Sequence, residues 1–253
     1  MEMRRMVLIL SAVFFIALTT SANAEWHFGI GTGLSATETK GEQGVNVVTN
    51  NIGPVKWDID PGDFVDTGFG LGGFATDGKW MIQSSFSYLE LSDETLETVG
   101  VNTVRGKFNF DISNVEFTVG YPIYQNKNLV LRGYSGLRYT KHNVGAKVVV
   151  DDVTRTDRDI DEDWTDVLLG LSTSVPFATQ WSWNSKFDAG FGGSEGSYCV
   201  NTGIAYNFAT HWSATIYGQF RTTEYENGTE ADEDWYFYDL DETSLGINIS
   251  YAW

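Results

Sequence analysis

The chain has 253 residues and carries 34 acidic against 16 basic side chains, which gives it a formal net charge of -18 at pH 7. A chain this acidic lacks the basic face that nucleic-acid binding requires, so we expect no nucleic-acid partner. The single cysteine, Cys199, excludes an internal disulfide, while 27 glycines, 4 prolines and 15% aromatic residues favour one β domain.

Residues 1–24 have the pattern of a secretory signal peptide. Arg4 and Arg5 precede an apolar run from Met6 to about Leu18, and the small-residue site "ANA" ends at Ala24. The alternative is a membrane anchor helix, but the run is short for a span of about 20 residues. We therefore expect cleavage after Ala24 and a mature domain of residues 25–253.

The mature chain alternates between apolar residues and small or polar ones in ten segments. Eight of them have the length of a tilted membrane strand, about 9–11 residues, and two are shorter, with seven residues each. The segments are 26–34, 67–73, 80–88, 115–121, 129–139, 167–175, 181–189, 198–208, 212–220 and 245–253. The pattern predicts an all-β fold, a transmembrane antiparallel up-and-down β-barrel, most simply of ten strands, with eight or twelve as alternatives.

The connections between these segments alternate in length. Short turns such as "TDGK", "PIYQNKN", "PFATQ" and "ATH" lie between long polar stretches at 38–62, 92–106, 143–163 and 226–235. Only "GGSEG" at 192–196 is short on the second side. Short turns at one end and long loops at the other are typical of outer-membrane barrels, whose turns face the periplasm.

Tryptophans gather at the segment ends beside the short turns, where they would form an aromatic girdle at one membrane interface. The alternative is that these rings fill the core of a soluble barrel. The girdle residues are Trp26, Trp80, Trp181, Trp212 and Trp253.

The closing segment "LGINISYAW", and the order of "GFGGS" before "GIAYNF", resemble the small outer-membrane β-barrel proteins of Gram-negative bacteria. The resemblance is to a porin-like or OmpA-like group of unsettled activity, and residues 166–253 resemble it most. It implies an outer-membrane location, a bilayer with lipopolysaccharide around the barrel, and recognition of terminal Trp253 by the barrel-assembly machinery. It implies no substrate or surface ligand.

A catalytic constellation is not visible in the sequence. "HWS" at 211–213 looks like the His-x-Ser of a lipid A deacylase, but it falls in a short periplasmic turn, far from outer-leaflet lipid. His142 falls at the outer rim with no serine close in sequence. We therefore expect no enzyme activity, with a lipid-modifying enzyme as an alternative.

The polar stretch "DDVTRTDRDIDED" from Asp151 is a weak candidate for a cation site. Asp157, Asp159 and Asp161 could offer oxygens to Ca²⁺, although an EF-hand is absent because its glycine position is occupied by Glu162. The alternative is a solvated acidic rim, and beyond this possible loop-bound divalent cation we expect no cofactor.

Charged residues also occur on the inward parity, where an isolated charge would be costly to desolvate. The acids are Asp66, Glu116, Asp166, Asp188 and Glu242, and the bases are Arg132, Arg138, Lys186 and Arg221. Heights counted from the periplasmic end predict the pairs Glu116–Arg132, Arg138–Asp166, Arg221–Glu242 and Lys186–Asp188. The alternative is separate groups in a wet channel.

A ten-stranded barrel is nearer the filled limit of about eight strands than the aqueous channels of about sixteen. We therefore expect a plugged, salt-bridged lumen and a structural or surface-interaction role. The alternatives are a small pore for solutes and the lipid-modifying enzyme.

Overall fold

The computed structural model describes residues 25–46, 54–59, 65–99, 102–150, 153–232 and 235–253. The expected signal peptide and Asp151 lie outside the described residues, as do the side chains of Asp66 and Asp157.

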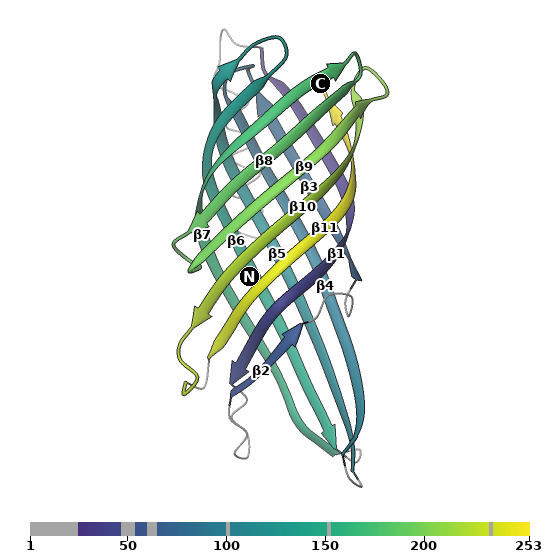
Figure 1. The fold of residues 1–253 in the computed structure, drawn as a ribbon, viewed down its shortest axis with the longest axis vertical. Helices are drawn as coiled ribbons and strands as arrows, with labels where there is room; N and C mark the ends of the chain where they lie inside the picture. The colour runs from purple at the N-terminus through teal and green to yellow at the C-terminus, as the bar shows by residue number, and fades with distance from the viewer. Residues whose placement is uncertain (1–24, 47–53, 60–64, 100–101, 151–152, 233–234) are drawn as a thin grey trace.

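Ten long strands form a closed barrel (Figure 1), in which each strand pairs antiparallel with its neighbours. Pairing of the first strand with the last closes the sheet, so the predicted ten-stranded up-and-down barrel is confirmed. The strands are β1 His27–Asn46, β3 Val65–Thr76, β4 Met81–Val99, β5 Asn102–Gln125, β6 Val130–Val150, β7 Val153–Ala178, β8 Trp181–Phe191, β9 Gly196–Asn207, β10 Trp212–Asn227 and β11 Tyr236–Ala252. An additional short strand, β2 Pro54–Ile59, pairs with the far end of β1.

The outer surface of the barrel is a band of exposed apolar side chains. Leu34, Leu71, Ile216 and Ile247 are 54%, 46%, 62% and 49% exposed, as the alternation of each strand requires. A protein surrounded by water rarely leaves so wide a continuous apolar surface uncovered, whereas a membrane barrel turns it towards lipid. Among the described residues there is no helix that could cross a membrane.

The short turns lie together at the top of Figure 1, the end that faces the periplasm in outer-membrane barrels. At the opposite, extracellular end the expected loops at 92–106 and 143–163 are wrong, because β4 to β7 continue through most of both stretches. These arms pair along nearly their whole length, up to Val99–Asn102 and Val150–Val153. Outside the bilayer both faces of a strand can be exposed to water, so these strands lack the apolar alternation of the lipid-facing segments, and their polar sequence was interpreted as loops.

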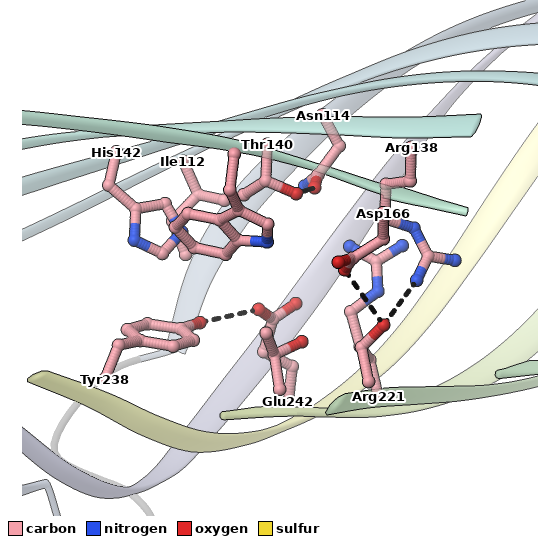
Figure 2. A pocket seen from close by; sticks show the side chains of 12 residues that line it. Ile112, Asn114, Arg138, Thr140, His142, Asp166, Arg221, Tyr238 and Glu242 are labelled. Carbon is pink, nitrogen blue, oxygen red and sulfur yellow. Dashed lines mark hydrogen bonds between the residues drawn. The ribbon is translucent and has the colours of Figure 1, made fainter. Parts of the chain in front are cut away.

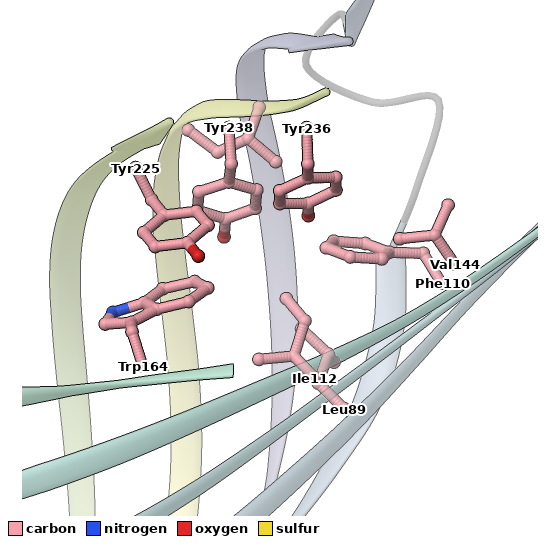
Figure 3. Packing of buried hydrophobic residues seen from close by; sticks show 9 residues of the cluster. Leu89, Phe110, Ile112, Val144, Trp164, Tyr225, Tyr236 and Tyr238 are labelled. Carbon is pink, nitrogen blue, oxygen red and sulfur yellow. The ribbon is translucent and has the colours of Figure 1, made fainter. Parts of the chain in front are cut away.

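The extracellular extension consists of two facing walls. Strands β4 to β7 form one wall, and β10, β11, β1 and β2 form the other. Buried side chains from both walls point towards one another between them (Figure 3). The barrel interior therefore has an aromatic core at its extracellular end, and polar side chains lie on the periplasmic side of that core.

Candidate functional site

The centre of the barrel interior is the Glu116 carboxylate on β5, which three cationic side chains approach. Arg138 Nε donates to Oε1 at 2.8 Å, and the two residues are register partners on β5 and β6. Lys186 Nζ from β8 donates to Oε2 at 2.9 Å, and Arg221 Nη2 from β10 lies 3.5 Å from Oε1. Three strands on different sides of the barrel are thereby tied to one carboxylate.

A second buried carboxylate, Asp188, completes this network. Arg138 Nη2 donates to its Oδ1 at 2.7 Å, and the Tyr134 hydroxyl donates to its Oδ2 at 2.8 Å. Lys186 Nζ lies 3.7 Å from the same oxygen. The side chains of Asp188 and Arg138 are 0% and 2% exposed, so these charges have exchanged water for one another.

Asp166 holds the β8–β9 hairpin against the barrel. Its Oδ1 accepts from the backbone N–H groups of Gly193 and Ser194 at 3.1 and 2.7 Å, and its Oδ2 accepts from Ser194 Oγ at 2.8 Å. Ser197 Oγ donates to the same Oδ2 at 3.4 Å and accepts from Arg138 Nη1 at 3.4 Å. The hairpin is therefore linked to the central network through one hydroxyl.

Glu242 on β11 lies beside this network. Its Oε1 accepts from the Tyr238 hydroxyl at 3.0 Å, and Arg221 is its register partner. Arg221 Nε is buried without a hydrogen-bond partner in the described part of the chain.

The structure brings together most of the charges singled out from the sequence, but with different partners. Only the Lys186–Asp188 pair is an ion pair as expected. Arg138 and Asp166 are register partners, yet the guanidinium turns to Glu116 and the Asp166 carboxylate turns to the hairpin. Counting from the strand ends placed Arg138 level with Asp166 and Arg221 level with Glu242 correctly, and failed only for Glu116 and Arg132. It could not show which of several neighbouring carboxylates a long guanidinium side chain would turn to.

Arg132 stands apart from the network. The sequence paired it with Glu116, whose oxygens are instead occupied by Arg138 and Lys186. Within the described ranges no ion pair or side-chain hydrogen bond of Arg132 is found, and its Nε is buried without a partner. The inward arginine nearest the periplasm thus lacks the carboxylate that was expected.

A small cavity separates the charged network from the aromatic core (Figure 2). Its volume is about 10 Å³, and Arg138, Asp166, Arg221 and Glu242 line one side of it while His142 lies on the other. A space of this size holds about one water molecule.

The aromatic core fills the lumen above that cavity. Trp164 of β7 stacks on Tyr225 of β10 with ring centroids 4.1 Å apart, and Tyr238 and Phe110 are 5.9 Å apart. The core contains Leu89, Phe110, Ile112, Val144, Trp164, Tyr225, Tyr236, Tyr238 and Leu240. This core was not predicted from the sequence, although the inward positions of β5, β6 and β11 continue to be apolar beyond the lipid-facing segments.

His142 is enclosed by the aromatic core. Its ring makes edge contacts with Phe110 and Trp164 at 4.9 and 4.6 Å, and its Nδ1 is 2.8 Å from the Tyr236 hydroxyl. Gln43 Nε2 donates to the same hydroxyl at 3.1 Å. Burial lowers the pKa of His142 to about 3, so the imidazole is neutral at physiological pH.

The two extracellular walls also contact each other on the extracellular side of the short β8–β9 hairpin. Glu162 of β7 accepts from the Tyr225 hydroxyl at 3.0 Å and from Asn227 Nδ2 at 3.2 Å. Because β8 and β9 end earlier than β7 and β10, these bonds and the Trp164–Tyr225 stack join β7 directly to β10.

The five tryptophans of the expected girdle lie at the periplasmic end. Trp80, Trp181, Trp212 and Trp253 are between 42% and 52% exposed, while Trp26 is half-buried. Trp253 also closes the seam, because its backbone exchanges hydrogen bonds of 2.9 and 2.8 Å with Phe28.

The remaining candidates lie on the surface. Asp159 and Asp161 are exposed, and Asp161 is 3.9 Å from Lys141 Nζ. No group of three side chains suited to a metal ion is found among the described residues. His211 lies exposed in a periplasmic turn, where its Nδ1 is 2.7 Å from the carbonyl oxygen of Ala252.

No family model matches the sequence, and no curated protein matches it. Among solved structures, the chain is similar to the outer-membrane protease OmpT from Escherichia coli, with a TM-score of 0.60 at 9% identity over 93% of this chain and 99% of that one. It is also similar to the translocator domain of the autotransporter NalP from Neisseria meningitidis, with a TM-score of 0.50 at 12% identity over 99% and 95%.

At these identities the similarity shows the fold alone. That fold, combined with the lipid-facing apolar band, places the chain in the outer membrane as a Gram-negative type of β-barrel. The closer resemblance of residues 166–253 to one group of such barrels stays a prediction.

Proposed function

We propose that the protein is a non-conducting outer-membrane barrel with a structural or surface-interaction role at the extracellular side. The observation that supports a closed lumen is the pair of stacked seals in its interior. The Glu116–Arg138–Asp188 network lies in the membrane, and the aromatic core lies above it.

Each seal rests on side chains that are held in place from several strands. Arg138 bonds to both Glu116 and Asp188, and Tyr236 bonds to both His142 and Gln43. Opening a path would require these groups to give up their partners, and each uncharged group left without a partner before water enters costs about 1–3 kcal/mol, with more for each charge. Such an interior supports a static plug rather than a gate.

The extracellular walls support the surface role. They extend paired strands beyond the lipid-facing band and place carboxylates on the outer face, among them Asp163, Glu224, Asp239 and Asp241, all exposed. A sheet of this kind offers a rigid, acidic surface to other molecules. The proposal contains no catalytic step and names no ligand.

Conductance of the refolded barrel in a planar bilayer tests the closed lumen. Wild-type protein should give no steady single-channel current. A variant with Tyr225, Tyr236, Tyr238 and Arg138 all changed to Gly removes much of both seals and should conduct, with heat-modifiable migration showing for both proteins that the barrel is folded. Large, steady current from the wild type would replace this proposal with the small-pore alternative.

Labelling of intact cells tests which end is displayed. In a Cys199→Ala background, Asp161→Cys should react with a membrane-impermeant maleimide. Lys127→Cys, in an exposed short turn, should react only after permeabilisation. The reverse pattern would place the acidic walls in the periplasm and contradict a surface role.

A further inference from the structure

The periplasmic half of the barrel interior, below the Glu116 network, is reached by solvent. Gln83 and Ser85 point inward, as the register of Thr118 with Gln83 and of Glu116 with Ser85 shows, yet both are exposed. Inward Ser172, Asn184 and Asn201 are half-exposed, whereas the inward residues of the extracellular half are almost all buried. We call the inward face of this periplasmic half, from Arg132 and Gln83 to Glu116, the lower lumen. In Figure 1 it lies in the upper part of the barrel.

Glycines keep one side of the lower lumen open. Gly31 and Gly33 on β1 face Gly72 and Gly70 on β3. A Cβ built on Gly70 would meet no atom closer than 3.8 Å, and one built on Gly72 none closer than 3.4 Å. Side chains could stand at Gly70 and Gly72, and their absence leaves room for a small solute on the β3 side. On the β1 side a Cβ at Gly31 would lie 3.1 Å from Asn248 and one at Gly33 would lie 2.6 Å from the Ile247 carbonyl oxygen.

The charge of the lower lumen is opposite to that of the protein as a whole. Strand parity directs no Asp or Glu inward between the Glu116 network and the periplasmic end, and this part of every barrel strand is described. The cations there are Arg132 and Lys186, and the Lys186 side chain is 29% exposed while it bonds to Glu116. A chain with a net charge of -18 therefore surrounds an acid-free chamber that carries an unmatched arginine.

Arg132 is placed to receive an anionic group. It is the register partner of Ser172 on β7, and Ser172 is in turn the register partner of Lys186 on β8, so a hydroxyl lies between two cations on one row. No carboxylate of the described residues pairs with Arg132. An arginine fork binds carboxylate or phosphate oxygens through two parallel hydrogen bonds, and the site is shielded above by the sealed network.

We propose that the lower lumen is a binding site, open to the periplasm and closed to the exterior, for a small solute that carries a phosphate or carboxylate group, with Arg132 as its cationic contact. Neutral hydroxyl and amide side chains such as Ser172 and Asn184 donate further hydrogen bonds around the same position. This inference rests on the closed lumen proposed above, which leaves the chamber one exit, so that it holds a solute and does not transport it.

Charge-selective cysteine modification tests the electrostatic part of this proposal. Ser172→Cys is introduced in a Cys199→Ala background, and folding is checked by heat-modifiable migration. An anionic methanethiosulfonate should modify it at least about tenfold faster than a cationic one of similar size. In Arg132→Gln the anionic and cationic reagents should react at nearly equal rates. In Arg132→Lys, which keeps the charge, the anionic reagent should still react faster. The control Lys127→Gln removes a charge outside the chamber and should keep the same preference.

Protection by inorganic phosphate and by acetate tests binding itself. Each anion should slow modification of Ser172→Cys by a neutral methanethiosulfonate along a saturating curve that is lost in Arg132→Gln. The two anions distinguish a phosphate from a carboxylate preference. Chloride at equal ionic strength should protect little.

Three outcomes would overturn the proposal. These are no reaction with the neutral reagent at either Ser172→Cys or Gln83→Cys, no charge preference, and protection that follows ionic strength without saturation. Failure of the closed-lumen function is distinguishable, because reagent added from the extracellular side of proteoliposomes would then reach Ser172→Cys.

Discussion

The two halves of the barrel interior are enclosed by the same ten strands and differ in almost every other respect. In the extracellular half the inward positions hold large or paired side chains such as Arg138, Trp164 and Tyr236, all 5% exposed or less. In the periplasmic half many of them hold Gly, Ser or Asn beside the inward rings of Tyr134 and Tyr217, and Arg132 has no ion-pair partner there among the described residues. Strand number alone therefore does not decide whether a barrel of this size is filled.

The largest expected effect separates the two inward arginines. Arg138→Ala should lower the free energy of unfolding by about 3–5 kcal/mol, because it leaves the buried Glu116 and Asp188 carboxylates short of their main counter-charge. Urea unfolding in detergent or liposomes measures it.

Arg132→Ala is the matched control, since it removes an arginine from the same strand without breaking an ion pair found in the described residues. It should change stability far less than Arg138→Ala. Equal losses from both variants would mean that the two halves do not differ in the way described here.

The next effect is a pH dependence that belongs to the extracellular half. The pKa of His142 is lowered by burial from 6.5 to about 3, so below pH 6.5 the unfolded chain binds a proton that the folded chain excludes. The contribution to stability is present in full above pH 6.5 and declines as pH falls towards 3. Stability measured between pH 7 and pH 5 should therefore decrease.

The decrease should be smaller in His142→Phe, and His211→Phe should leave it unchanged because His211 is exposed. If the wild type and His142→Phe show the same slope, the imidazole is not held neutral in the core.

A smaller effect concerns the hydroxyl that joins the two walls of the aromatic core. Tyr236→Phe keeps the ring but removes the partner of both His142 Nδ1 and Gln43 Nε2. A loss of about 1–3 kcal/mol is expected, since two buried groups lose a hydrogen bond. Tyr198→Phe, on the outer face and 56% exposed, should change little, and thermal unfolding of both variants makes the comparison.

The smallest effect is expected at the acidic rim, outside both halves of the lumen. If Asp157, Asp159 and Asp161 hold Ca²⁺, the cation should raise the melting temperature by a term that depends on its concentration, and changing all three to Asn should remove the rise. Exposed pairs contribute less than about 1 kcal/mol, so the shift should be slight. A matched triple variant, Glu224→Gln, Asp239→Asn and Asp241→Asn, keeps the candidate site and should retain the response. A melting temperature that does not change with Ca²⁺ would contradict a cation site and support the alternative of a solvated acidic rim.

The barrel and its short-turn end could be predicted from the amino-acid sequence, and so could ten strands, with eight and twelve as the alternatives that the structure removed. Strand alternation has a period of two, so the inward position of Arg138 and the outward position of Ile247 follow from counting residues along one strand. The clustering of Trp80 and Trp181 beside short turns likewise needed no knowledge of other strands. These features are local, and they survive in any register.

The contacts between inward residues of strands that are not neighbours were decided by the closed barrel. The pair Lys186–Asp188 lies on one strand, and Arg138–Glu116 follows from the register of β5 with β6. The contacts of Arg138 with Asp188 and of Arg221 with Glu116 join strands that are not neighbours, so they depend on the closed barrel. The aromatic core depends in addition on two walls folding towards each other above the membrane, where the polar sequence of the arms had indicated loops. Stagger is a property of the closed sheet and not of any one strand, so the charged residues of the lumen could be named from the sequence while most of their contacts could not.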